Sequence, residues 1–167
     1  MSHPVLGLPP ADPTAGRTDA AARLRRGRAV IGRLALQAAS AADPQLAQRY
    51  DETMLRRFLQ DYEQHVEQLA RALETGEARL VTDYAEWLVP IFRRRRVPVR
   101  DQNTLLAGLR EAAATVLTPD DGRALGTLID AWLARLKFHR ALPGDHEGNA
   151  VARFIWKGAG ILDETVI

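Results

Sequence analysis

Residues 43–76 read DPQLAQRYDETMLRRFLQDYEQHVEQLARALETG, and this stretch decides the fold that the sequence predicts. Six of its large side chains recur at alternating intervals of four and three, which places them along one face of a helix. They are Leu55, Leu59, Tyr62, Val66, Leu69 and Leu73. Asp43 followed by Pro44 is typical of a helix start, and Gly76 is typical of a helix end. The pattern therefore predicts one long amphipathic helix, which needs partner helices to cover its apolar face.

Four further stretches show helical periodicity, and none alternates as a strand does. We expect helices near residues 18–40, 78–95, 99–117 and 118–142. The expected core positions are, in chain order, Leu24, Ile31, Leu34, Ala38, Leu80, Val81, Tyr84, Leu88, Ile91, Leu105, Leu109, Ala113, Val116, Leu125, Leu128, Ile129, Trp132 and Leu136. The prediction is an all-α, antiparallel bundle of four to five helices over residues 18–142, with the first helix packed alongside the other four.

The two ends of the chain differ from this central part. Residues 1–17 are rich in proline and glycine and show no period, so we expect a flexible arm there. Residues 143–167 begin with a polar linker and continue as an apolar tail, which we expect either to close one end of the bundle or to bind a partner. The partner-binding residues that the second interpretation predicts are Val151, Phe154, Ile155, Trp156, Ile161, Val166 and Ile167.

The composition excludes several classes of protein. The chain has no cysteine, so it has neither a disulfide framework nor a thiolate metal site. Its formal net charge is only +2, which does not favour nucleic-acid binding. We see no secretory signal and no apolar run of the roughly 20 residues that a membrane span needs. We therefore expect a cytoplasmic protein without a membrane span.

Arginine is concentrated in two places. Five arginines fall within residues 23–33, and we interpret them as the solvated face of a helix. Arg93, Arg94, Arg95 and Arg96 form the densest run, at the expected end of a helix, where positive charge is favourable. Four consecutive arginines are also a candidate anion-binding site.

The residues show no catalytic or metal-binding pattern. The histidines lack the spacing of a helical metal site, and the chain has no phosphate-binding glycine loop or nucleophilic serine motif. We therefore expect no cofactor, no metal and no enzymatic activity. His65 lies beside the apolar face of the long helix, either as a buried structural residue or as a ligand-binding one. A pocket for a flat, tetrapyrrole-like ligand would be lined by Tyr62, His65, Tyr84, Trp87 and Trp132.

Residues 55–117 resemble the helical domain found beside cobalamin-binding modules in some bacterial regulators. The resembling features are His65 ahead of ARALETGE, then Tyr84 and Trp87, then an arginine followed by VPV. The resemblance implies a sensory or cap-like module that serves signalling. It does not imply cobalamin binding, because residues 145–148 do not match the Asp-x-His-x-x-Gly loop of the separate cobalamin module.

Three hypotheses about function follow. The first is a non-enzymatic regulatory or adaptor module that contacts another protein, or a second copy of itself, through the C-terminal tail. The second is a small-molecule sensor with a pocket between its helices. The third is a nucleic-acid binder that uses the arginines of residues 23–33 and Arg93 to Arg96.

Overall fold

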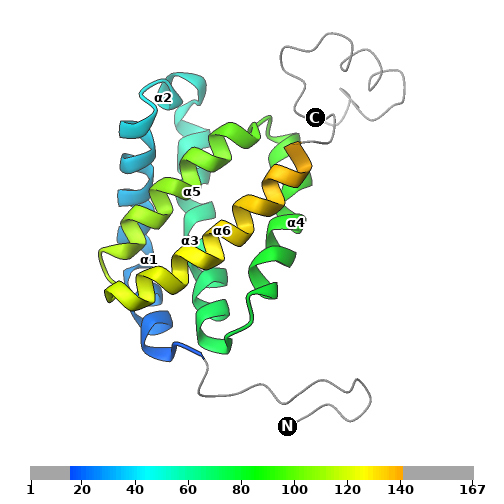
Figure 1. The fold of residues 1–167 in the computed structure, drawn as a ribbon. Helices are drawn as coiled ribbons and strands as arrows, with labels where there is room; N and C mark the ends of the chain where they lie inside the picture. Colours follow the sequence, from blue (N-terminus) through cyan, green and yellow to red (C-terminus); the bar gives the residue numbers. More distant parts are fainter. Residues whose placement is uncertain (1–15, 141–167) are drawn as a thin grey trace.

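The computed structural model describes residues 16–140, which form six helices and no strand (Figure 1). They are α1 (Thr18–Ala42), α2 (Leu46–Arg49), α3 (Glu52–Thr75), α4 (Arg79–Arg94), α5 (Val99–Ala114) and α6 (Pro119–Arg140). The predicted all-α class is confirmed. None of these helices combines the length and the apolar character needed to cross a bilayer. The apolar tail and nearly all of the predicted arm lie outside the described residues.

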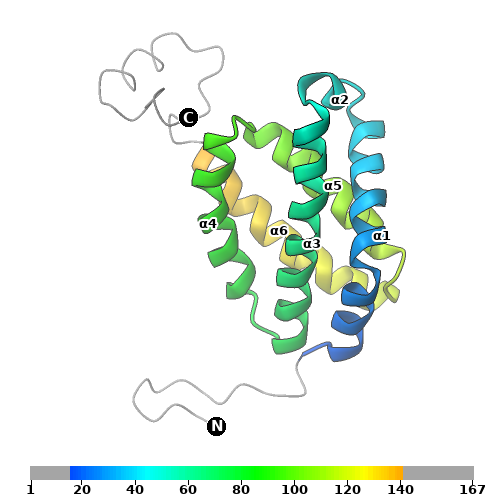
Figure 2. The same cartoon turned by 180° about the vertical axis from the view of Figure 1, so that it is seen from behind.

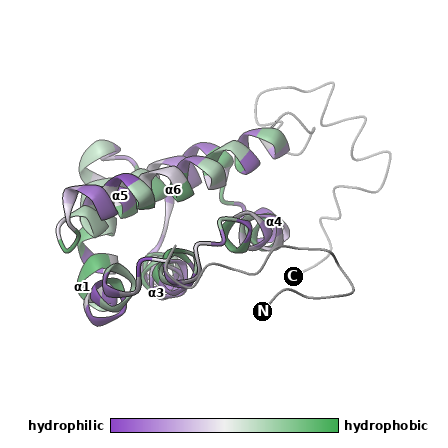
Figure 3. Ribbon diagram, turned by 60° about the horizontal axis from the view of Figure 1, so that its bottom comes forward, coloured by the Kyte–Doolittle hydropathy of each residue, from purple (hydrophilic) through white to green (hydrophobic). Residues whose placement is uncertain are grey.

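The long helices lie in two layers (Figure 3). In the first layer α1, α3 and α4 lie side by side, with successive helices running in opposite directions (Figure 2). In the second layer α5 and α6 cross the first obliquely. α1 packs along both α3 and α5, and α4 packs on α6. The first helix was predicted to lie beside a bundle of four, whereas α1 contacts both layers.

Small residues allow a close approach between the layers. Gly108 of α5 faces the backbone of α1 so closely that an added Cβ would overlap the carbonyl oxygen of Ala35 and lie 3.0 Å from the backbone nitrogen of Ala39. Ala35 and Ala39 are fully buried. Because the residues at a contact set the distance between two helices, alanine and glycine let α1 and α5 approach closely. Leu34 was predicted to be in the core, but it is 39% exposed.

The predicted helix over residues 43–76 is interrupted near its start. α1 continues to the residue before Asp43, whose carboxylate accepts the backbone N–H of Gln45 at 3.1 Å. The short α2 follows, and α3 begins only after Asp51, whose carboxylate accepts a backbone N–H of the first turn at 2.8 Å. The prediction that Asp43 caps the long helix is therefore wrong, because Asp51 offers a second capping carboxylate and α3 begins there.

α3 buries a wider face than one stripe. Four of its predicted core residues are buried, namely Tyr62, Val66, Leu69 and Leu73, whereas Leu55 and Leu59 are half-buried. Phe58, His65, Ala70 and Ala72 are buried as well. Alternating intervals of four and three are typical of a helix that contacts one neighbour, but α3 has α1 on one side and α4 on the other. At its C-terminal end, Gly76 adopts the left-handed conformation (φ 72°), as predicted for a helix stop.

The predicted faces of the later helices are largely confirmed. α6 buries all five of its expected residues, which are Leu125, Leu128, Ile129, Trp132 and Leu136. α5 buries Leu105, Leu109 and Ala113, and Val116 is half-buried beyond its end. α4 buries Val81 and Leu88, together with Ala85, Val89 and Phe92. Its expected residues Leu80, Tyr84 and Ile91 are half-buried, and the helix continues through Pro90.

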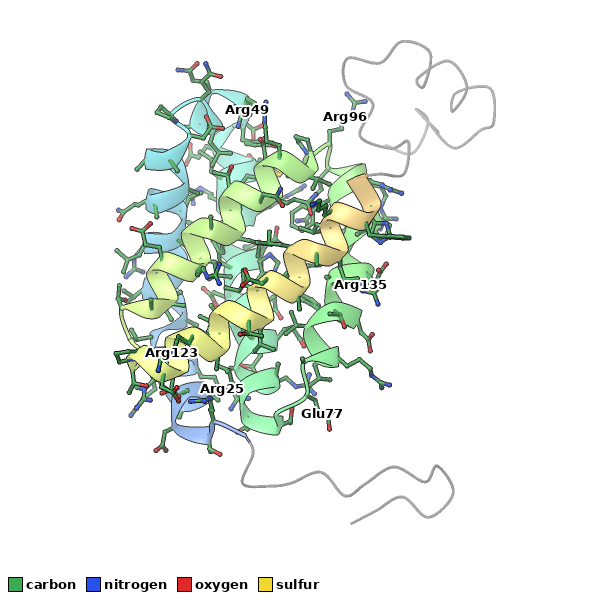
Figure 4. All side chains as sticks on the ribbon, viewed as in Figure 1. Arg25, Arg49, Glu77, Arg96, Arg123 and Arg135 are labelled. Carbon is green, nitrogen blue, oxygen red and sulfur yellow. The ribbon has the colours of Figure 1, made fainter. Side chains whose placement is uncertain are left out.

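A buried carboxylate fixes the segment between α1 and α3. The side chain of Asp101, in the first turn of α5, is 0% exposed. It accepts hydrogen bonds from Arg49 Nε at 3.1 Å, Arg49 Nη2 at 2.9 Å and the hydroxyl of Tyr50 at 2.7 Å. A buried carboxylate without such partners is costly, so these bonds hold α2 and the start of α3 against α5. Figure 4 shows Arg49 at this junction.

The contact at Gly108 is testable with two glycine substitutions. Gly108→Ala is expected to lower the free energy of unfolding by about 1–3 kcal/mol, because the methyl group can be accommodated only if two helix backbones move apart. Gly122→Ala is the matched control, since an added Cβ there meets nothing within 4 Å. It is expected to raise the free energy of unfolding by about 0.5–1 kcal/mol through helix propensity. Urea denaturation followed by circular dichroism measures both. Equal stabilisation by the two substitutions would contradict the close contact.

Candidate functional site

His65 lies at the centre of a group of aromatic side chains from α3, α4 and α6. Its ring centroid is 6.2 Å from that of Tyr62, 5.7 Å from Tyr84, 6.4 Å from Phe92 and 5.0 Å from Trp132. Its Nδ1 lies 3.0 Å from the hydroxyl of Tyr84. The structure therefore brings together four of the five residues that the sequence analysis assigned to a ligand pocket. We call His65 and the four rings around it, those of Tyr62, Tyr84, Phe92 and Trp132, the aromatic cluster.

The members of the aromatic cluster fill the space between their helices. They meet mostly edge to face, which is the preferred geometry of packed aromatic rings. Tyr62 and Trp132 are each 2% exposed. The hydroxyl of Tyr62 donates a hydrogen bond of 2.9 Å to the carbonyl of Leu105 on α5. In this conformation the side chains expected to surround a flat ligand are packed against one another.

Burial controls the protonation of the aromatic cluster. Together with the positive charge of Arg95, which has the smaller effect, burial lowers the pKa of His65 to about 3, so the imidazole is neutral at pH 7. Burial also raises the pKa of Tyr62 and of Tyr84 above the usual tyrosine value. Beside the cluster, burial raises the pKa of the Asp61 carboxyl even though Arg95 Nη1 lies 2.6 Å from it. The buried site therefore favours neutral groups.

Trp87, the fifth predicted pocket residue, lies on the surface. Its ring stacks on Tyr84 with a centroid distance of 5.9 Å, and it is 62% exposed. Phe138 of α6 is 60% exposed. Glu86 precedes Trp87 and His139 follows Phe138, and His139 Nε2 lies 2.6 Å from Glu86 Oε2. This contact places the turns of α4 and α6 that carry the two exposed aromatic residues side by side. We call Trp87 and Phe138 the aromatic pair.

Phe138 was missed in the sequence analysis, although a signal was present. The core face of α6 follows a regular helical spacing up to Leu136, and Phe138 falls off that face. A large aromatic residue on the polar side of an amphipathic helix is the pattern that indicates an exposed contact residue. The same reasoning applies to Trp87, which the sequence analysis placed in a pocket.

The arginine run divides into structural and exposed members. Arg95 pairs with Asp61 of α3, and its guanidinium lies 5.9 Å from the ring centroid of Phe92. The other three arginines of the run are exposed. One member of the predicted anion site therefore joins α4 to α3, and the other three remain on the surface.

The arginines of α1 act mainly between helices. Arg23 pairs with Asp121 of α6 at 2.6 Å, Arg25 with Glu74 of α3 at 2.8 Å, and Arg28 with Glu63 of α3 at 3.8 Å. Arg17, at the end of the predicted arm, pairs with Asp120 and Asp121. Arg26 and Arg33 are exposed. These pairs compensate much of the positive charge of α1.

The remaining surface of the described residues gives weaker indications of a binding site. An open groove between α5 and α6 is lined by Arg110, Leu117, Pro119, Arg123 and Asp130, none of them a predicted site residue. Arg110 and Asp130 bind each other there through two hydrogen bonds of 3.0 Å. Within residues 16–140, no group of three or more acidic or histidine side chains is arranged to hold a metal ion. The tail residues predicted to bind a partner lie outside the described range.

Comparisons of the chain with protein-family models, with characterised proteins and with solved structures give no significant match.

The buried histidine predicts a specific pH dependence. The pKa of His65 is about 3 in the folded chain and ~6.5 in an unfolded one, so the unfolded chain binds the proton first as the pH falls. The stability contributed by neutral His65 is complete above about pH 6.5 and decreases as the pH falls toward 3. His65→Asn keeps a polar group near the Tyr84 hydroxyl and cannot titrate. Between pH 7 and pH 5 it should reduce the loss of unfolding free energy by up to about 2 kcal/mol. Urea denaturation at the two pH values tests this, and equal losses in both proteins would exclude it.

Proposed function

We propose that this chain is a non-enzymatic helical adaptor or regulatory module that acts by binding another protein. The observation that carries the proposal is the aromatic pair. Exposing the large apolar side chains of tryptophan and phenylalanine to water is unfavourable. Aromatic residues are also enriched in the centres of protein interfaces. Trp87 and Phe138 are held on neighbouring turns of two packed helices, which supports a preorganised contact surface.

The position of the aromatic pair supports the same proposal. Phe138 is two residues before the end of α6, and the sequence continues into the apolar stretch 151–156. A partner bound at the aromatic pair would therefore be within reach of this stretch, which was predicted to be a contact element. The resemblance of residues 55–117 to a helical module of bacterial regulators agrees with a role in signalling.

A small-molecule sensor is the second candidate, favoured by the convergence of the aromatic cluster around His65. Binding of a flat ligand would require Tyr84 to separate from His65, because their contact now occupies that space. Titration with haem, followed by its visible absorption, would test this candidate against the His65→Asn variant.

The adaptor proposal predicts that binding depends on the aromatic pair. Affinity capture from the source cells, combined with sedimentation of the purified chain, would compare the wild type with Trp87→Ala/Phe138→Ala. The double variant should fold normally but lose at least about tenfold in binding to a partner or to a second copy. Val30→Ala/Leu34→Ala is the control, because these side chains are the other large exposed apolar residues within 16–140, at 48% and 39% exposure on α1.

Two results would contradict the proposal. One is that the same proteins bind equally to all three chains, and the other is that the control loses binding as strongly as the aromatic variant. A version of the chain that ends at Gly148 separates the contribution of residues 149–167 from that of the aromatic pair.

A further inference from the structure

Four exposed arginines gather where α4 ends. Arg93, Arg94 and Arg96 lie there, on either side of Arg95, and none of the three forms an ion pair within residues 16–140. Arg57 of α3 lies one helical turn before Asp61, and Asp61 binds Arg95 at 2.6 Å. Arg57 therefore lies beside the same end of α4, and its charge acts on Asp61. We call Arg57, Arg93, Arg94 and Arg96 the arginine surface.

Arg96 has an unusual backbone conformation. Its φ is 56°, in the left-handed region, and it is the one residue other than glycine with a positive φ in the described chain. Its N–H donates to the carbonyl of Arg93 at 3.0 Å, and the N–H of Val97 donates to the carbonyl of Phe92 at 2.9 Å. This is the hydrogen-bond pattern of a helix stop that normally contains glycine.

The fold does not require arginine at this position. A residue with a side chain is strained in the left-handed region, whereas glycine is not. The side chain of Arg96 projects outward from the turn between α4 and α5 (Figure 4), and it makes no ion pair within residues 16–140 that would compensate for the strain. Strain that persists without a packing role indicates a functional role for the side chain.

The arginine surface adjoins the aromatic pair through Arg94 of α4. Trp87 and Arg94 are seven residues apart, which is two helical turns, so they lie on the same face of the helix. Tryptophan and arginine are the residue types that contribute most to protein interfaces. The planar guanidinium group binds a carboxylate through two parallel hydrogen bonds.

We propose that the arginine surface binds an acidic segment of a partner protein through its aspartate or glutamate carboxylates. This proposal rests on the proposed adaptor function and names the chemistry of the partner. A nucleic acid fits less well, since it needs a long basic track that contacts many phosphates. Here the N-terminal end of α3 carries Glu52 and its capping residue Asp51, and the chain as a whole has a net charge of only +2.

Arg96→Gly separates binding from folding. Glycine relieves the left-handed strain, so the variant should melt at the same temperature as the wild type or higher. It should nevertheless bind a fluorescent oligoglutamate peptide about two- to fivefold more weakly, and Arg93→Ala/Arg94→Ala should bind it up to about tenfold more weakly. Fluorescence anisotropy with the full chain, at about 50 and 200 mM salt, measures both losses, which should shrink at the higher salt.

The matched control is Arg26→Ala/Arg33→Ala, which removes the same charge from exposed arginines of α1. It should change peptide affinity less than about twofold. An equal loss in the control would reduce the effect to net charge and overturn the proposal, as would an Arg96→Gly variant that binds like the wild type. Tighter binding of an oligonucleotide with the same number of charges would assign the surface to phosphate instead.

Two further variants complete the test. If Asp163→Asn/Glu164→Gln increases peptide affinity, acidic residues of the chain itself occupy the surface, and the partner assignment is wrong. Trp87→Ala/Phe138→Ala should bind oligoglutamate like the wild type, because this probe has no apolar group. If the wild type captures a partner but does not bind the oligoglutamate peptide, the acidic-segment proposal is rejected and the adaptor proposal stands. Equal partner capture by the wild type and Trp87→Ala/Phe138→Ala, with intact peptide binding, would reject the adaptor role of the aromatic pair alone.

Discussion

The structure depends on the backbone contact between α1 and α5. At Gly108 no side chain separates the two helices, so their distance is set by the backbone of α1 at Ala35 and Ala39. This contact fixes how the second layer crosses the first. α6 follows α5 in the second layer and reaches α4, and the rings around His65 are enclosed between α3, α4 and α6. A close approach of small residues at one side of the molecule thus determines where its aromatic core lies at the other.

Some charged side chains join the helices through ion pairs, and others remain free on the surface of the described residues. Buried Asp101 holds the segment before α3, and Arg25 and Arg95 join neighbouring helices through acidic partners. Arginines used in this way contribute little net field to the surface, because each is neutralised at short range. Arg93, Arg94 and Arg96 at the end of α4 differ, since they have no such partner among residues 16–140. The distribution of ion pairs, more than the number of arginines, distinguishes structural charge from charge available for binding.

The sequence predicted the class and most helix faces, because apolar periodicity is a local property of each segment. It identified all five core residues of α6 and the helix stop at Gly76. It did not predict the two-layer packing, because a contact made by glycine and alanine produces almost no hydrophobic signal. It also placed the start of the long helix at Asp43 rather than Asp51, since both residues are good caps and tertiary contacts of the intervening segment decide between them.

In the candidate sites too, local sequence patterns predicted some features, and contacts between helices decided the others. Four of the five predicted pocket residues do converge, because their spacing on three helices directs them to one place. Trp87 lies outside, and the pairing of Arg95 with Asp61 depends on how α4 meets α3, which no local pattern contains. The order of the helices has a consequence for synthesis on the ribosome. α1 and α3 are synthesised before α5, and the alanine face of α1 is covered only when α5 has emerged, so α1 and α3 can pair before the second layer closes over them.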